Sequence, residues 1–180
     1  MDETSVLLII ASQGFEQTEY HDTKKAIAAA GFPVVTASDK LGNATAKNGS
    51  HVPVEISIDK VDVSNYAGIF FIGGPAALEH LDNATSYKIA QDAFDQNKPI
   101  GAICISTRIL AKAGILHDRY ATGWNEDGEL NKIFADNNVH YLPEEKVVVD
   151  GIIITATDPS AAHDFGTHIV EMLQNQQQWG

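Results

Sequence analysis

Short, wholly apolar runs that alternate with longer helical patterns constrain the fold of this chain more than any other feature. Residues 5–11 read SVLLIIA and residues 69–72 read IFFI. Strands that are apolar at consecutive positions are buried on both faces, as in a parallel sheet covered by helices. A helical pattern over 16–30, closed by Gly31, leads from the first run to a strand over 34–37. This βαβ order predicts an α/β fold with right-handed crossovers.

The rest of the chain continues the alternation and ends in an amphipathic helix that starts at Pro159. With 180 residues and 44% hydrophobic content, the chain can bury one full core, so we expect a single domain over 1–180 with a frayed tail over 174–180. The further predicted elements are an edge hairpin at Asn48-Gly49 with its second strand over 52–58, helices over 86–96, 106–113 and 130–137, strands over 99–103 and 139–141, and a hairpin of 147–149 with 152–155.

Net charge, the N-terminal residues and the single cysteine limit the partners and the compartment that we expect for this chain. The chain has 24 acidic and 12 basic residues and a net charge of −12, which argues against a nucleic-acid or anionic membrane surface. No apolar stretch has the length of a membrane span, and the acidic residues 1–4 lack the basic start of a secretory signal. One unpaired cysteine further suggests a reducing compartment. We therefore expect a cytoplasmic protein, for which small-molecule substrates or protein partners remain.

The single cysteine, Cys104, lies where the predicted strand over 99–103 turns into the helical pattern over 106–113. A thiol at such a turn faces the positive end of a helix, which favours the thiolate and a nearby oxyanion. The alternative is a small buried apolar residue, a common role for free cysteine. The carboxyl ends of parallel strands meet at one edge of a sheet. The loop over 12–19 and the segment over 73–75 should therefore converge on this turn.

Several motifs together resemble the ThiJ/PfpI superfamily, over residues 5 to about 173. This superfamily includes the parkinsonism-associated deglycase, PfpI-type proteases, glyoxalase III enzymes and isonitrile hydratases. The resemblance implies a class I glutamine amidotransferase-like fold, that is, a flavodoxin-like three-layer sandwich with a mostly parallel central sheet and a nucleophile elbow. It also implies a homodimer that uses no cofactor. The matching motifs are Gly14-Phe15-Glu16-Gln17-Thr18-Glu19, Gly73-Gly74, Ala102-Ile103-Cys104 and Val147-Val148-Val149-Asp150-Gly151.

The resemblance also implies roles for individual residues. Cys104 matches the family nucleophile, and Glu19 matches the carboxyl group that hydrogen-bonds to its sulfur. Such a carboxyl would be protonated, because burial and a neighbouring thiolate both raise its pKa. The alternative for Glu19 is an ordinary acid in the first turn of a helix. The backbone N–H groups of Gly74 and Ile105 match the oxyanion-binding donors of the family.

The chain departs from the family at both usual histidine positions. Ile105 stands where PfpI-type members have a histidine after the cysteine, and Gly123 stands where other members have one in a later loop. A thiol with a lowered pKa can react without a base, but the amine released by a peptidase would lack a proton donor. His163 is a candidate substitute, although an ordinary surface position is the alternative. The histidine spacing fits no metal site.

Three residues are candidate walls of the pocket: Phe15, Gly73 and Trp124. For the aromatic pair, core or interface positions are the alternative. The expected function is a cysteine-dependent enzyme of the glyoxalase or deglycase type that acts on a small reactive carbonyl. The alternatives are an oxidative-stress sensor or chaperone-like protein that uses reversible oxidation of Cys104, and an inactive member that acts through its dimer surface. A PfpI-type peptidase has the least support.

Overall fold

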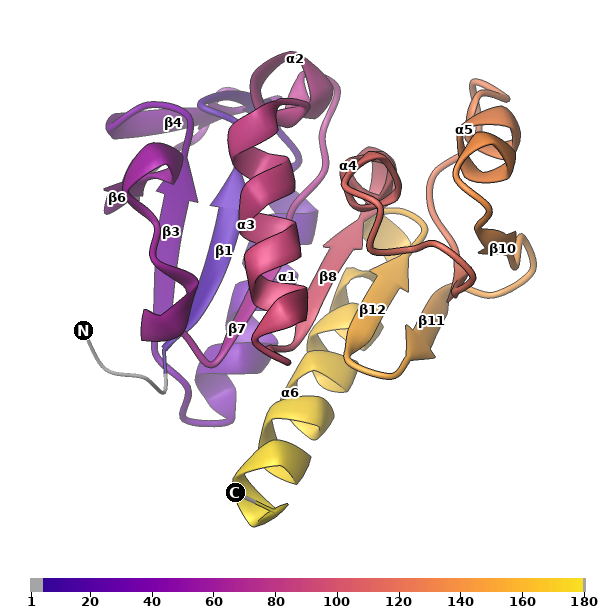
Figure 1. The fold of residues 1–180 in the computed structure, drawn as a ribbon. Helices are drawn as coiled ribbons and strands as arrows, with labels where there is room; N and C mark the ends of the chain where they lie inside the picture. The colour runs from indigo at the N-terminus through magenta and orange to yellow at the C-terminus, as the bar shows by residue number, and fades with distance from the viewer. Residues whose placement is uncertain (1–4, 180) are drawn as a thin grey trace.

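A seven-stranded, mostly parallel sheet forms the centre of the molecule (Figure 1) in a computed structural model that describes residues 5–179. Its strand order is β11-β12-β8-β7-β1-β3-β6, and only the β11–β12 pair is antiparallel. The strands are β1 (Val6–Ile10), β3 (Val34–Ser38), β6 (Ile56–Ser57), β7 (Gly68–Phe71), β8 (Ile100–Ile103), β11 (Val147–Asp150) and β12 (Ile153–Ala156).

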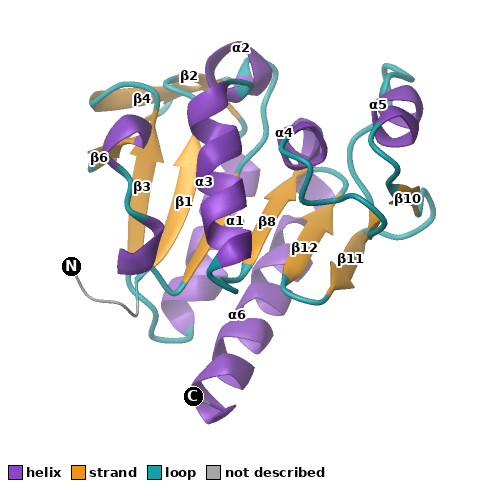
Figure 2. Cartoon of the chain, viewed as in Figure 1, coloured by secondary structure: helices purple, strands orange, loops and turns teal. Residues whose placement is uncertain are grey.

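Helices cover both faces of this sheet (Figure 2), which gives the three layers that the sequence predicts. The helices α1 and α6 pack against each other behind the sheet, and α3 crosses its front. The helices are α1 (Gln17–Ala29), α2 (Ala77–Leu81), α3 (Ala84–Asp95), α4 (Thr107–Lys112), α5 (Leu130–Asp136) and α6 (Ala162–Trp179). The flavodoxin-like α/β architecture is therefore confirmed.

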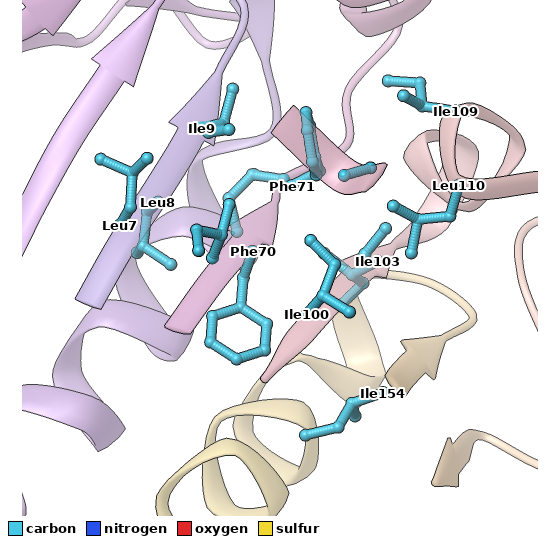
Figure 3. Packing of buried hydrophobic residues seen from close by; sticks show 14 of the residues in the cluster. Leu7, Leu8, Ile9, Phe70, Phe71, Ile100, Ile103, Ile109, Leu110 and Ile154 are labelled. Atoms are coloured by element: carbon cyan, nitrogen blue, oxygen red, sulfur yellow. The ribbon is translucent and has the colours of Figure 1, made fainter. Parts of the chain in front are cut away.

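The core lies on both sides of the central strands (Figure 3). Every residue of β1 and β7 is buried, as the uninterrupted apolar runs predict. Phe70 and Ile154 point to the side of the sheet that faces α6, where Phe70 meets Phe165 edge to face. Full burial of each large apolar side chain contributes about 1.5–3 kcal/mol. This rigid centre holds the loops at the carboxyl ends of the strands.

Small sheets and short turns complete the chain. The predicted hairpin at Asn48-Gly49 is confirmed as the turn between β4 (Gly42–Ala46) and β5 (His51–Val54), which join β2 (Gln13–Phe15). Elsewhere β9 (Tyr120–Ala121) pairs with β10 (His140–Tyr141). The 3₁₀ turns are η1 (Ile58–Lys60), η2 (Val63–Asn65), η3 (Cys104–Ser106) and η4 (Pro159–Ala161).

One predicted strand was wrong in its extent. The strand predicted over 52–58 divides at Glu55, because β5 pairs with β4 whereas β6 pairs with β3. The Glu55 N–H donates to the Thr36 carbonyl (2.9 Å) at this crossing point. For the tail over 174–180 fraying stays a prediction: its described part is assigned to α6, which ends at Trp179, and residue 180 lies outside the described residues. Within 5–179, no helix is both long and apolar enough to cross a bilayer.

Candidate active site

Cys104 begins η3 directly after β8, and its backbone has the left-handed conformation with a φ of +63°. A side chain in this region costs roughly 1–2 kcal/mol. The turn is held by the buried Ser106 hydroxyl, which donates to the Ile72 carbonyl (2.8 Å). The Thr107 hydroxyl donates to the carbonyl of Cys104 itself (3.1 Å). The sharp strand-to-helix turn expected of a nucleophile elbow is therefore present.

Glu19 lies beside this turn because α1 begins at the same edge of the sheet. The Glu16 side chain caps α1 by accepting the Glu19 N–H (2.8 Å), which places Glu19 in the first turn. The Glu19 carboxyl is fully buried, and its Oε2 accepts the Gly73 N–H (2.7 Å). Cys104 is the side chain that hydrogen-bonds to this carboxyl. The second oxygen, Oε1, has no other partner among the described residues.

Gly73 makes the approach of these two side chains possible. A Cβ at this position would lie 2.7 Å from the Cys104 Cβ and 2.7 Å from Glu19 Oε2. Side-chain atoms do not tolerate such distances, so only glycine fits between the nucleophile and the carboxyl. Gly73 is therefore a buried support beneath the site and not part of the cavity wall.

Burial decides the protonation of both groups. It raises the pKa of Glu19 to about 8, although the Gly73 N–H and Cys104 act in the opposite direction. The carboxyl is therefore mostly protonated at pH 7. Burial, together with the charge of ionised Glu19, also raises the pKa of the Cys104 thiol, and the Ile105 N–H opposes this rise. A neutral Glu19 removes the repulsion, so the two groups share at most one negative charge near neutral pH.

Burial acts against the lowered pKa that the sequence predicts for the Cys104 thiol. The residue is only 9% exposed, and loss of hydration disfavours the thiolate. The following α4 helix has six residues, so its dipole is that of a short helix.

The residues of both expected oxyanion donors, Gly74 and Ile105, line the same cavity as the thiol. The Ile105 N–H hydrogen-bonds to the Cys104 sulfur in the resting site. Among the described residues, the Gly74 N–H donates to no backbone carbonyl or side chain. Both residues line a cavity of about 650 Å³ together with Cys104, Glu19 and Trp124. The geometry fits the stabilisation of an oxygen that becomes negative beside the sulfur.

Two predicted pocket residues lie elsewhere. Phe15 is fully buried and packs edge to face on Tyr20, with 5.6 Å between ring centroids. It belongs to the core because its strand β2 turns the ring inward. His163 is exposed on α6 and is not a lining residue. No histidine is among the described residues that line the cavity.

The backbone at Gly123 explains why a histidine is missing from the later loop. A Cβ at this position would lie 2.1 Å from the Thr107 Oγ1. The loop therefore packs directly on α4, and the Trp124 N–H donates to the Cys104 carbonyl (3.3 Å). No imidazole can project from residue 123 in this arrangement.

Arg108 holds the same loop from behind and was not identified from the sequence. Its side chain is 3% exposed, and it donates to Asp127 Oδ1 (2.7 Å). The guanidinium also lies over the Trp124 ring, 5.6 Å from the centroid. A buried arginine with these partners fixes the wall of the cavity. Its position in a regular helical pattern gave no signal of this role.

A second polar cluster, also missed, ties α2 to the sheet. Asp39 accepts the Ser12 N–H (2.8 Å) and the Ser12 hydroxyl (2.9 Å), and His80 Nδ1 lies 2.9 Å from its Oδ2. Because α2 follows the Gly73-Gly74 turn, this cluster also supports the turn that carries the Gly74 N–H. Over residues 5–179, no group of three or more histidine, cysteine or acidic side chains is arranged to hold a metal ion.

Comparisons with known proteins agree with this geometry. The model of the DJ-1/PfpI family matches residues 4–172. A deglycase of Pyrococcus horikoshii is 29% identical over 174 residues, which cover 93% of this chain and 99% of the relative. The crystal structure of a ThiJ/PfpI domain protein from Brachyspira murdochii superposes with a TM-score of 0.91 at 26% identity and covers 97% and 99% of the two chains.

A further solved structure is that of oxidized DJ-1 from Toxoplasma gondii. It is 27% identical, superposes with a TM-score of 0.82, and the match covers 97% of this chain and 93% of that one. The family match spans the elbow, the glycine pair and the buried glutamate together. The chain belongs to the DJ-1/PfpI family.

Proposed function

We propose that this protein is a cysteine-dependent enzyme that adds the Cys104 thiol to a small reactive carbonyl, such as an α-oxoaldehyde. One observation carries the proposal. The buried Glu19 carboxyl is mostly protonated at neutral pH, contacts the thiol, and leaves Oε1 without another partner. A neutral carboxyl in this position can accept the thiol proton and deliver one to the substrate.

The step is balanced without a histidine. The sulfur attacks the carbonyl carbon, a C–S bond forms, and the π electrons move to the oxygen, which faces the N–H groups of Gly74 and Ile105. Glu19 relays the thiol proton to this oxygen and returns to its starting state. The product is a hemithioacetal. Addition to an aldehyde expels no amine, so the missing histidine matters less here than in peptide cleavage, which needs a proton donor for the leaving group.

The name of one relative agrees with this class of substrate. The Pyrococcus horikoshii protein is named a deglycase, and deglycation acts on adducts of reactive carbonyls. A peptidase role has weaker support, because no histidine is among the described residues that line the cavity.

The test is the consumption of methylglyoxal by the purified protein. We expect Cys104→Ser to reduce the rate to background and Glu19→Gln to reduce it by roughly the 10²–10⁴-fold typical of a lost acid–base group. Glu171→Gln, an exposed change on α6, serves as the matched control and should retain the wild-type rate. Equal background rates for wild type and Cys104→Ser would reject the proposed activity.

A second candidate is an oxidation sensor. A protonated Glu19 with a free Oε1 can donate a hydrogen bond to a sulfinate formed at Cys104 by peroxide. The Toxoplasma gondii structure is that of an oxidized DJ-1. Intact mass after mild peroxide treatment tests this candidate. Addition of two oxygen atoms that stops at that stage supports it, whereas an unmodified thiol or direct passage to the sulfonic acid argues against it.

A further inference from the structure

The lysine that lines the cavity and the arginine behind its wall already have anionic partners. Lys47 Nζ lies 3.4 Å from Glu16 Oε1. Arg108, behind the wall, lies 2.7 Å from Asp127 Oδ1. Each of these pairs is close to neutral. A negatively charged ligand would therefore find no unpaired lysine or arginine among the described lining residues.

Two lining carboxylates, in contrast, form no ion pair within 4 Å among the described residues. Among the described residues, no lysine, arginine or histidine lies within 4 Å of the carboxylate of Asp158 or Glu126. Although partial burial raises the pKa of Asp158, hydrogen bonding from Ser160 lowers it below the ordinary value, and the charge of Lys146, which lies beyond ion-pair distance, acts in the same direction. Asp158 is therefore ionised at neutral pH. Its charge acts on the Cys104 sulfur itself.

The buried Glu19 supplies an independent sign that a ligand enters here. Its carboxyl is fully buried and belongs to the cavity lining. Its Oε1 has no partner apart from the thiol. Buried polar atoms are nearly always hydrogen-bonded, so this oxygen is available to a polar group of the substrate. Because the protonated Glu19 is uncharged, it does not change the negative charge that Asp158 and Glu126 bring to the cavity.

We infer that this cavity selects uncharged and cationic electrophiles and rejects those that carry a carboxylate, with Asp158 and Glu126 as the residues that set this selectivity. The inference deepens the proposed function by defining its substrate class. An α-oxoaldehyde, or a carbonyl adduct next to an ammonium or guanidinium group, fits the cavity. An α-oxo carboxylate does not, because its charge would approach the half-buried carboxylate of Asp158 and the exposed carboxylate of Glu126.

The direct test measures how fast Cys104 reacts with two thiol reagents of similar size and opposite charge. Trimethylammonioethyl methanethiosulfonate is a cation, and sulfonatoethyl methanethiosulfonate is an anion. In both reactions the thiolate displaces methanesulfinate and forms a mixed disulfide. Each rate is divided by the rate of the same reagent with the urea-unfolded chain, which removes intrinsic reactivity.

We expect the normalised rate ratio of cation to anion to exceed about ten at low ionic strength, where the Debye length reaches about 30 Å. The ratio should fall in high salt. Asp158→Asn and Glu126→Gln should each lower it roughly two- to five-fold, and the double variant should bring it close to one. Glu171→Gln removes the same charge from the distant α6 helix and should leave the ratio unchanged.

Three results would overturn the inference. One is a ratio near one for the wild type, and another is a ratio that neither single variant changes. The third is an equal decrease in Glu171→Gln, which would assign the effect to the net charge of −12 and not to the cavity. Folding of each variant is checked by its urea unfolding midpoint.

A turnover measurement separates this inference from the proposed function. We expect the kcat/KM for methylglyoxal to exceed that for glyoxylate, and Asp158→Asn to narrow the difference. If no carbonyl is turned over but the labelling ratio responds to both variants, the proposed reaction fails and the charge selectivity stands. If charged and uncharged carbonyls are consumed equally well and the cation-to-anion labelling ratio is near one, the charge selectivity is rejected and the proposed reaction stands.

Discussion

The buried Glu19 carboxyl makes the stability of this protein depend on pH in a direction opposite to that of most acidic residues. Burial raises its pKa from 4.5 to about 8 in the folded chain, while the unfolded chain keeps a value near 4.5. Between these values the unfolded state binds fewer protons than the folded state. Stability therefore falls as pH rises. The contribution is fully present below pH 4.5 and is lost as pH rises to 8.

The magnitude follows from the two pKa values. Each pH unit inside this interval costs about 1.4 kcal/mol of unfolding free energy. The loss is about 3 kcal/mol by pH 7 and on the order of 5 kcal/mol at pH 8 and above. Glu19→Gln removes this dependence, because the amide does not ionise and its carbonyl oxygen can still accept the Gly73 N–H. The variant should thus gain stability over the wild type as pH rises.

Urea unfolding at pH 5, 6, 7 and 8 measures the effect. The difference between Glu19→Gln and the wild type should be small at pH 5 and grow steadily to pH 8. Glu171→Gln is the control for removal of a carboxylate and should show no such growth. Parallel curves for wild type and Glu19→Gln would refute the raised pKa, and with it the neutral carboxyl on which the proposed proton relay depends.

Three further predictions concern the supports of the site. Gly73→Ala would place its Cβ 2.7 Å from Glu19 Oε2. We therefore expect the unfolding free energy, measured with urea, to fall by about 1–3 kcal/mol and methylglyoxal consumption to be lost. A variant as stable as the wild type would contradict the close approach. Asp39→Asn should cost about 1–3 kcal/mol at pH 7. Burial raises the pKa of Asp39, but its hydrogen bonds prevail and lower it, so the cost should shrink in urea titrations as pH falls below 3.8. Arg108→Leu should destabilise by about 1–3 kcal/mol and shift the Trp124 emission; an unchanged spectrum would count against the stacked pair.

The sequence predicts the sheet and the elbow because both depend on local patterns. The apolar run of β1 and the strand-to-helix change at Cys104 are visible in single segments. The position of Glu19 follows from its place after β1 and from the family resemblance. These features required no knowledge of how distant segments pack.

Other properties of the site arise only from tertiary packing. The raised pKa of Cys104 comes from burial, which no single segment reveals. Phe15 was expected at the pocket, but its contact with Tyr20 places it in the core. Asp158 was not identified from the sequence, because its charge near Cys104 depends on the approach of η4 to the elbow. Long-range approaches of this kind lie beyond periodicity and turn signals.

The contact between Gly123 and Thr107 has a consequence for protein engineering. A histidine cannot be installed at 123 by one substitution, because its Cβ would overlap the Thr107 hydroxyl at 2.1 Å. Thr107 must first become a smaller residue, which also removes its hydrogen bond to the Cys104 carbonyl. Conversion to a Cys-His enzyme therefore passes through an intermediate with a loosened elbow. The two positions form an epistatic pair, in which the order of changes decides whether each step retains a folded site.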